Sequence, residues 1–292
     1  MINLQPTIPL QPGDAIATVA PSSALNDDQR LREGLSILES WGLLALEQSV
    51  ADRRWGYLAG RDGERFSDLT QTAPLLACAR GGWGAARLLE RPVPWQPGWL
   101  LGFSDVTALL LARLAAGYAG GVHGPLLNTL AEEPEWSRER LRRLLFGEPI
   151  PQLIGEPRGG GTATGPLLVA NLTVASHLLG SPLMPSLQGT ILILEDVGEA
   201  PYRIDRMLTH WRLCGALQSV AGIGFGRFEG CNAPDDDHTS FSLTDVLQER
   251  TDDLGLPVVM DLPVGHICGN SALPLGKLAR LDGDRGELSL MS

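Results

Sequence analysis

Short apolar runs alternate with amphipathic segments in the first half of the chain, and this order constrains the fold more than any other feature. Apolar runs predict strands at residues 15–20, 43–46, 74–78, 100–103 and 120–122. Apolar residues at helical spacing predict helices at 28–41, 64–69 and 106–116. Continuous apolar runs are typical of strands buried on both faces. Because strands that alternate with helices form βαβ units, we expect an α/β fold with a mostly parallel sheet.

Three loops follow these predicted strands and carry small or polar residues. They are Pro21–Ser23, Arg80–Gly84 and Gly102–Asp105. Ligands of open parallel sheets bind outside the carboxyl ends of the strands. We therefore expect a functional site at this edge of the sheet.

The composition changes after the first 130 residues, which predicts a division of the chain. Residues 1–130 form the predicted N-terminal α/β domain, and 131–165 read as a linker or crossover with a polar, Arg-rich helix. Residues 166–292 form a second, more mixed domain. It has predicted helices at 171–179 and 202–213, strands at 190–194, 220–226 and 257–260, and a hairpin around 282–284.

The charge balance excludes some classes of partner. The chain has 23 Lys and Arg against 34 Asp and Glu, a formal net charge of −11. This argues against nucleic acid and against an anionic membrane surface. No apolar run approaches the ~20 residues needed to span a bilayer, and the first residues lack the basic and apolar regions of a signal peptide. The four cysteines show no C-x-x-C pair, so we expect neither disulfides nor a zinc site, and a cytoplasmic location.

Ser104 lies in the turn between a predicted strand and a predicted helix. A serine at such a turn exposes its hydroxyl, and the first amides of the helix point toward the same place. That geometry suits a nucleophile whose oxyanion is stabilised by backbone N–H groups. The spacing departs from Gly-x-Ser-x-Gly because Val106 stands where the second glycine would be. The alternative is that Ser104 and Asp105 are ordinary N-cap residues.

Two further segments carry polar groups to strand ends. The glycines of Arg80–Gly84 allow backbone amides to approach a ligand closely, although the loop matches neither G-x-G-x-x-G nor a P-loop. Its alternative is a plain glycine turn. Glu195 follows the apolar run 191–194 and is expected at the strand tip, partly desolvated and in need of a partner. Its alternative is a solvated helix entry shared with Asp196 and Glu199.

His266 is the best placed of the five histidines for acid–base chemistry, because it lies in a turn after a predicted strand. His123, at another predicted strand end, is a candidate for lining the site. Ser104, Glu195 and His266 would supply a nucleophile, an orienting acid and a general base. Whether the three side chains converge is left open by the sequence.

The chain resembles the LD-carboxypeptidases, a family of serine peptidases that also contains microcin-immunity peptidases. The resemblance rests on an ordered set of segments over nearly the whole chain. They are 20–23, 58–62, 80–89, 102–105, 123–125, 171–173, 194–199, 201–206, 265–266 and 273–276.

The resemblance implies Ser104 as the nucleophile, with Glu195 and His266 completing a triad. It implies an oxyanion hole from the backbone N–H of Asp105 and of either Gly81 or Gly82. It implies a flavodoxin-like N-terminal domain, a smaller β-rich α+β C-terminal domain, and no metal or cofactor. It further implies a cytoplasmic homodimer that releases terminal D-alanine from murein tetrapeptides, at the bond to the L-centre of a diamino acid.

The substrate details are less constrained. A carboxypeptidase recognises a free carboxylate, for which Arg203 and Arg80 are candidates by position. Trp83 is also a candidate substrate-binding residue, and it stands where the family usually has tyrosine. A microcin-immunity enzyme that cleaves a peptidyl-nucleotide amide is an alternative, but the second domain offers only Trp211 as a tryptophan to stack a base. A nonhydrolytic α/β ligand-binding protein is the other alternative.

Overall fold

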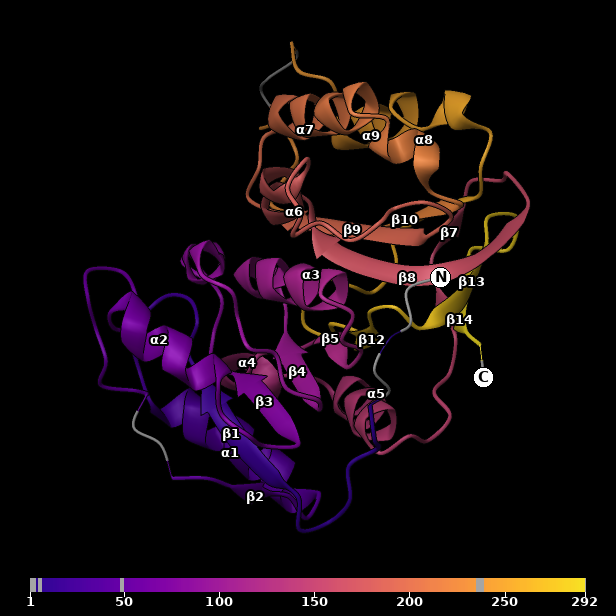
Figure 1. Ribbon diagram of the computed structural model, residues 1–292. Helices are drawn as coiled ribbons and strands as arrows, with labels where there is room; N and C mark the ends of the chain where they lie inside the picture. The colour runs from indigo at the N-terminus through magenta and orange to yellow at the C-terminus, as the bar shows by residue number, and fades with distance from the viewer. Residues whose placement is uncertain (1–3, 5–6, 48–49, 235–238, 292) are drawn as a thin grey trace. The chain divides into compact units, whose positions relative to one another are not determined.

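The computed structural model describes residues 4, 7–47, 50–234 and 239–291, and the chain divides into two compact units (Figure 1). Unit 1 comprises Met1–Ile150 and Cys268–Leu275, and unit 2 comprises Pro151–Ile267 and Gly276–Ser292. Unit 1 therefore takes back a short segment from the last part of the chain. Both units are α/β, and the first contains the predicted parallel sheet.

The sheet of unit 1 has the flavodoxin strand order. Its strands are β1 (Ala15–Val19), β2 (Leu44–Ala45), β3 (Leu75–Cys78), β4 (Trp99–Gly102), β5 (Gly121–His123) and β12 (Leu273–Pro274). The order is β12-β5-β4-β3-β1-β2, in which β1 to β5 are parallel and β12 is antiparallel to β5. The predicted strands and the predicted fold class are confirmed.

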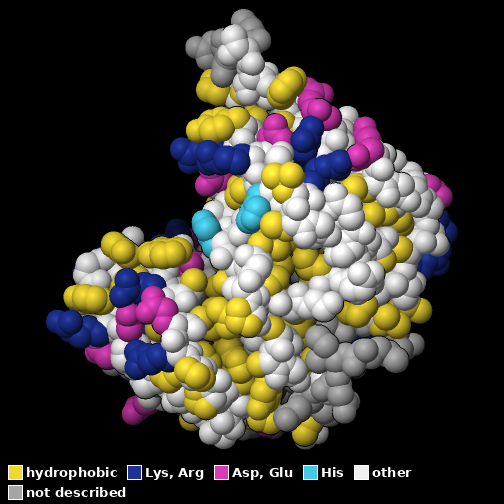
Figure 2. Space-filling view, turned by 45° about the horizontal axis from the view of Figure 1, so that its top comes forward, with side chains coloured by type: hydrophobic (Ala, Val, Ile, Leu, Met, Phe, Trp, Pro, Cys, Tyr) yellow, Lys and Arg dark blue, Asp and Glu magenta, His cyan; other side chains and the backbone are white. Residues whose placement is uncertain are grey.

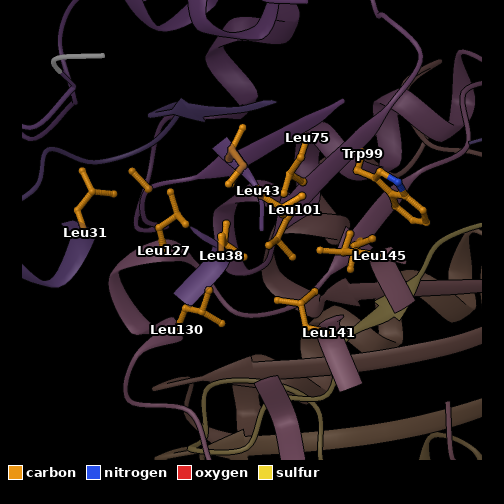
Figure 3. Packing of buried hydrophobic residues seen from close by; sticks show 14 of the residues in the cluster. Leu31, Leu38, Leu43, Leu75, Trp99, Leu101, Leu127, Leu130, Leu141 and Leu145 are labelled. Carbon is orange, nitrogen blue, oxygen red and sulfur yellow. The ribbon is translucent and has the colours of Figure 1, made fainter. Parts of the chain in front are cut away.

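Successive side chains of each strand point to opposite faces of the sheet. Because the apolar side chains on both faces must be buried, helices cover the sheet of unit 1. The helical elements are α1 (Gln29–Ser40), α2 (Asp62–Leu69), η1 (Ala86–Glu90), η2 (Ser104–Val106), α3 (Thr107–Ala115), α4 (Leu127–Leu130) and α5 (Glu135–Leu145). Figure 3 shows the core in which Leu38 of α1 and Leu141 of α5 meet Leu75 and Leu101 of the sheet. The segment after the glycine loop Arg80–Gly84 forms the short 3-10 helix η1.

Unit 2 is built on a mixed sheet whose two edges meet on one segment. Its strands are β6 (Leu153–Ile154), β7 (Glu156–Pro157), β8 (Thr162–Asn171), β9 (Ile191–Val197), β10 (Gly222–Glu229), β11 (Val258–Met260), β13 (Leu278–Asp282) and β14 (Glu287–Leu290), in the order β6-β14-β13-β8-β9-β10-β11-β7. Strands β8 to β11 are parallel. Residues 153–157 pair with β14 at their start and with β11 at their end, so the sheet curls and leaves few open edges.

The helical elements of unit 2 are α6 (Leu172–Leu178), α7 (Pro201–Leu213), α8 (Ala216–Ser219), α9 (Leu243–Glu249) and η3 (Asp252–Leu254). Helices α7, α8 and α9 lie together on one side of the sheet (Figure 1). The predicted helices at 171–179 and 202–213 and the C-terminal hairpin are confirmed. Strand β8 was not predicted, although it pairs with both β9 and β13.

The surface carries both signs of charge. On the face shown in Figure 2, acidic and basic side chains are interspersed and do not form a large patch of one sign. Within the described residues, none of the helices has the length and apolar character needed to cross a membrane.

Gly34 of α1 gives a test of the core of unit 1. A Cβ added there would lie 1.9 Å from the backbone oxygen of Leu127 in α4. Although Gly→Ala inside a helix normally gains about 1 kcal/mol, we expect Gly34→Ala to lose about 2 kcal/mol through overpacking. Gly63→Ala is the matched control, because Gly63 is exposed in α2 and a Cβ there meets nothing within 4 Å. Urea unfolding of both variants checks the opposite signs, and a stabilised Gly34→Ala would contradict the close packing.

Candidate functional site

Ser104 occupies a sharp turn between β4 and the helical segment η2–α3. Its φ is +61°, an uncommon value for a non-glycine residue. The turn requires Gly102, because a Cβ there would lie 2.8 Å from Cγ1 of Val106. Backbone conformations of this kind cost free energy and are concentrated at functional sites. The predicted strand-turn-helix arrangement around Ser104 is therefore present, with one 3-10 turn before the α-helix.

The glycine loop Arg80–Gly84 packs directly against this turn. A Cβ built on Gly81 would lie 3.0 Å from Cβ and 3.1 Å from Oγ of Ser104. Gly82 has φ +108° and instead lies against Ser23, whose Oγ would be 2.4 Å from an added Cβ. The two glycines thus have different neighbours, and Gly81 is the one beside the Ser104 side chain.

Asp105 ties the two loops together. Its side chain is buried, with a residue exposure of 1%, and Oδ2 accepts a 2.8 Å hydrogen bond from the N–H of Ala85. Burial raises the pKa of this carboxyl, while hydrogen bonds from Ser22 and from the backbone of Ala85 and Gly84 oppose the rise. The same residue therefore follows Ser104 in the chain and fastens the end of the glycine loop through its side chain.

A buried arginine supports the loop from the other side. Arg65 of α2 is fully buried and donates hydrogen bonds to the backbone oxygens of Gly84, at 2.8 Å, and of Pro21. Its other contact is Asp62, at 2.5 Å, which also pairs with Arg87 at 2.8 Å. The hydrogen bond from Arg87 and the proximity of Arg65 lower the pKa of Asp62 to about 2. This ion-pair network holds the loops after β1 and β3 in place.

The candidate substrate-binding residues have different surroundings. Arg80 donates to the backbone oxygens of Ala24, at 2.9 Å, and Gly81, at 3.3 Å, so two of its nitrogens hold loop structure. Trp83 is 45% exposed. Arg203 lies in the first turn of α7, where its half-exposed side chain pairs with Glu199 at 3.3 Å. Arg80 and Trp83 belong to unit 1, and Arg203 belongs to unit 2.

In unit 2, Glu195 and His266 are in direct contact. Oε2 of Glu195 lies 2.8 Å from Nδ1 of His266. The Glu195 side chain is fully buried, whereas that of His266 is 20% exposed. Burial raises the pKa of the Glu195 carboxyl, and the His266 and Asn171 side chains oppose this rise. A buried carboxylate thus faces one ring nitrogen of a partly exposed histidine, which is the arrangement expected of an orienting acid and its base.

The backbone around Glu195 is shaped to admit this contact. Register between β9 and β10 shifts between Phe225 and Phe228, so two residues of β10 lie opposite Glu195 alone. Such β-bulges are common beside active sites. A Cβ on Gly226, inside the bulge, would lie 3.2 Å from Cβ of Glu195, and one on Gly265 would lie 3.0 Å from both Cβ and Oε2. Both glycines leave room for the Glu195 side chain.

The next residue, Asp196, anchors the neighbouring strand end. It accepts hydrogen bonds from Asn171 Nδ2, at 3.1 Å, and from the N–H and hydroxyl of Thr173, at 2.8 and 2.7 Å. Asn171 is also paired with Glu195 in the register of β8 and β9, and it caps α6 by accepting from Val174. These contacts fix the end of the strand that carries Glu195.

His123 is buried at the end of β5 rather than lining an open surface. Its ring packs edge-on against Phe103 at 5.6 Å between centroids. In the sheet it lies between Gly102 and Leu273. It therefore supports the turn of Ser104 from within unit 1.

The structure brings the predicted residues together in two groups. Ser104, Asp105 and Gly81 lie together in unit 1, and Glu195 and His266 lie together in unit 2. The meeting of Ser104 with His266 stays a prediction. The sequence does not predict that the Asp105 side chain holds the glycine loop or that Asn171 contacts Asp196. For Asn171, the preference of asparagine for helix N-caps was an available signal.

Two family models match most of the chain. The LD-carboxypeptidase N-terminal domain matches residues 16–124, and the LD-carboxypeptidase C-terminal domain matches residues 164–281. The first range contains Ser104 and the second contains Glu195 and His266. The group in unit 1 therefore lies within the matched N-terminal domain, and the group in unit 2 lies within the matched C-terminal domain.

Known proteins are similar over nearly the full length. A candidate carboxypeptidase of Synechocystis sp. is 47% identical over 296 residues, covering 99% of this chain and 97% of that protein. A murein tetrapeptide carboxypeptidase of Pseudomonas aeruginosa is 33% identical over 306 residues, covering 94% and 95%. A solved structure of the microcin C7 self immunity protein covers 98% of each chain with a TM-score of 0.86 at 20% identity, which shows a shared fold.

Glu195→Gln tests the burial of the carboxyl. The folded-state pKa of Glu195 is raised above its ordinary value of 4.5. The wild type therefore loses stability as pH rises through that raised pKa, and the neutral amide does not. We expect the Tm difference, variant minus wild type, to become more positive as pH rises above the ordinary pKa of 4.5 toward the raised one. Glu229→Gln, at an exposed position of β10, should show no such trend, and a pH-independent difference for Glu195→Gln would contradict the raised pKa.

Proposed function

Because the chain belongs to the LD-carboxypeptidase family, we propose that it is a serine hydrolase that releases terminal D-alanine from murein tetrapeptides. The scissile bond joins the L-centre of a diamino acid to the D-alanine. The relation to the Pseudomonas aeruginosa enzyme, at 33% identity over 94% of this chain, supports this substrate class. The proposal assigns Ser104 as nucleophile, His266 as general base and Glu195 as the acid that orients it.

The observation that carries the proposal is the contact between His266 and the buried Glu195 carboxylate, at 2.8 Å. A carboxylate facing Nδ1 favours the tautomer with a proton on that nitrogen. Nε2 then carries the lone pair that accepts a proton from a nucleophile. The carboxylate also stabilises the imidazolium that forms, without itself becoming protonated.

The first half of the reaction forms an acyl-enzyme. Ser104 Oγ attacks the carbonyl carbon of the scissile bond while its proton passes to Nε2 of His266. The carbonyl oxygen becomes an oxyanion that accepts hydrogen bonds from the N–H groups of Asp105 and Gly81. The intermediate collapses, the C–N bond breaks, and His266 returns the proton to the amine of the departing D-alanine. In the second half, water attacks the ester carbonyl carbon while His266 takes its proton. The bond to Ser104 Oγ then breaks, His266 returns the proton to that oxygen, and the tripeptide leaves with a free carboxylate.

Gly81 is preferred to Gly82 as the second oxyanion donor. A Cβ on Gly81 would touch the Ser104 side chain, whereas one on Gly82 would meet Ser23. The buried Asp105 carboxylate, 2.8 Å from the N–H of Ala85, supports the same assignment because it fastens this loop to the Ser104 turn. Donors held in advance stabilise the transition state without reorganisation.

Arg203 is preferred to Arg80 for binding the substrate carboxylate. Arg80 already donates to two backbone oxygens. Arg203 is half-exposed, and its partners are two side chains at the surface, Glu199 at 3.3 Å and the Tyr202 hydroxyl at 3.1 Å. Exposed contacts of this kind contribute little. Its guanidinium is therefore easily redirected to an anionic ligand.

The biological setting follows from the family relation. We propose that the protein acts in the cytoplasm on recycled cell-wall peptides, as a homodimer. The microcin-immunity alternative rests on likeness of fold at 20% identity. Trp211, considered above for stacking a base, is fully buried in α7 and donates its indole N–H to Ser176 at 2.8 Å. It therefore gives that alternative no support.

Ser104→Ala tests the proposal directly. The purified protein is incubated with L-Ala-γ-D-Glu-meso-diaminopimelate-D-Ala, and D-alanine is detected by mass spectrometry. We expect release by the wild type and at least a ~10³-fold slower rate for the variant, because the covalent intermediate is lost. A fluorophosphonate should label the wild type and not the variant. A folded wild type that neither releases D-alanine nor is labelled would contradict the proposal, and cleavage of a peptidyl-nucleotide amide instead would favour the alternative.

Arg203→Ala tests the carboxylate site. Loss of a charge-assisted contact should raise KM for the tetrapeptide by roughly 10- to 100-fold, with a smaller change in kcat. Arg206→Ala is the matched control, since Arg206 is also exposed on α7, one turn along. An unchanged KM in Arg203→Ala would remove this residue from the role.

A further inference from the structure

The chain segment that follows His266 is held by a carboxylate in unit 1. Oε2 of Glu133 accepts hydrogen bonds from the N–H groups of Gly269, at 2.8 Å, and Asn270, at 3.0 Å. Glu133 is only 7% exposed. Its burial raises the pKa of the carboxyl, while Ser137 and the two backbone amides oppose this rise. Burying a carboxylate is costly, so this contact is a specific feature of the fold.

Three residues of α5 hold the same segment. Ser137 Oγ donates to the backbone oxygen of Asn270 at 2.9 Å, and Arg140 Nε donates to that of Ala272 at 3.0 Å. The Trp136 ring lies so close to Gly269, which has φ +94°, that an added Cβ would be 2.6 Å from the ring. Trp136, Ser137 and Arg140 lie in α5, and Glu133 lies just before the helix, next to its N-cap residue Pro134. We call them the backbone clamp: Glu133, Trp136, Ser137 and Arg140.

The clamp fixes the position of this segment in the sheet that carries Ser104. Leu273 of β12 pairs with His123 of β5, and His123 pairs with Gly102 of β4. Ser104 follows Gly102 by two residues. A continuous ladder within unit 1 therefore connects the clamped segment to the nucleophile turn.

The clamp also limits where His266 can lie. His266 precedes Gly269 by three residues, and three residues span at most about 10 Å. The N–H of Ile267 bonds to the oxygen of Gly265 at 2.9 Å, so the connection is turned rather than fully extended. His266 is thus tethered closely to a point that is fixed within unit 1, although it belongs to unit 2.

From these contacts we propose that Glu133 is a positioning residue for the general base. Through the amides of Gly269 and Asn270 it sets where the loop carrying His266 ends, relative to the turn of Ser104. The inference rests on the proposed function, in which His266 accepts the proton of Ser104. It assigns a catalytic consequence to a segment that reads in sequence as an acidic linker.

Glu133→Gln is the direct test, with Glu132→Gln as the matched control. The amide keeps an acceptor oxygen of the same size but loses the charge that strengthens both bonds. Glu132 is the neighbouring residue, and its half-exposed carboxylate pairs with Arg30 at 2.8 Å. We expect kcat for D-alanine release to fall 10- to 100-fold in Glu133→Gln while KM stays within about threefold. Fluorophosphonate labelling of Ser104 should slow by a similar factor, and Glu132→Gln should match the wild type in both measurements.

A second variant keeps the test usable if Glu133→Gln does not fold. Ser137→Ala removes the clamp hydroxyl that donates to the backbone oxygen of Asn270 and lies beside the Glu133 carboxyl. We expect a smaller fall in the same two rates with KM unchanged. The inference is overturned if a folded Glu133→Gln, or in its place Ser137→Ala, keeps kcat and labelling within twofold of Glu132→Gln. Failure of the proposed function is distinguished by the wild type, which would then neither release D-alanine nor be labelled, and the inference would fall with it.

Discussion

The contact between His266 and the buried carboxylate of Glu195 is the interaction on which the proposed chemistry depends. A carboxylate removed from water is costly unless it is paired, and here the histidine 2.8 Å away supplies the partner. The surrounding backbone makes room for it through the bulge in β10 and through Gly226 and Gly265. Asn171, opposite Glu195 in the sheet, adds a second polar neighbour. The local irregularities of unit 2 are thus consequences of accommodating one charged side chain.

In unit 1, the corresponding constraint is the uncommon backbone conformation of Ser104. Ser104 has a positive φ, and such a residue persists only where its neighbours over-determine it. Asp105 and Arg65 provide this restraint by binding backbone groups of the glycine loop from two sides. Because both side chains are buried, their bonds are little weakened by competing water. Rigidity at the nucleophile therefore comes from side chains that hold the backbone.

The sequence predicts features governed by local patterning. Apolar runs revealed β1, β3 and β4, and the turn of Ser104 followed from its place between two such elements. Strand β8 could not be predicted, because its first half, Thr162–Pro166, is mostly exposed and contains glycine and proline. Both residue types are depleted in strands. The contacts of Glu133 could not be predicted from the sequence for another reason. Its partners are backbone amides 136 and 137 residues away, and backbone groups leave no trace in residue identity.

The return of Cys268–Leu275 to unit 1 is the feature from which the proposed role of the clamp follows. In the proposed triad Ser104 belongs to unit 1 and His266 to unit 2, and proton transfer requires hydrogen-bond distance between base and nucleophile. Here the chain itself supplies a restraint, three residues after His266. A misplacement of about 1 Å can cost on the order of 10²-fold in rate. We therefore expect a shift of the segment that Glu133 holds to change the rate of D-alanine release. The proposed role of Glu133 therefore gives its buried charge a function, which is to hold the segment that follows His266.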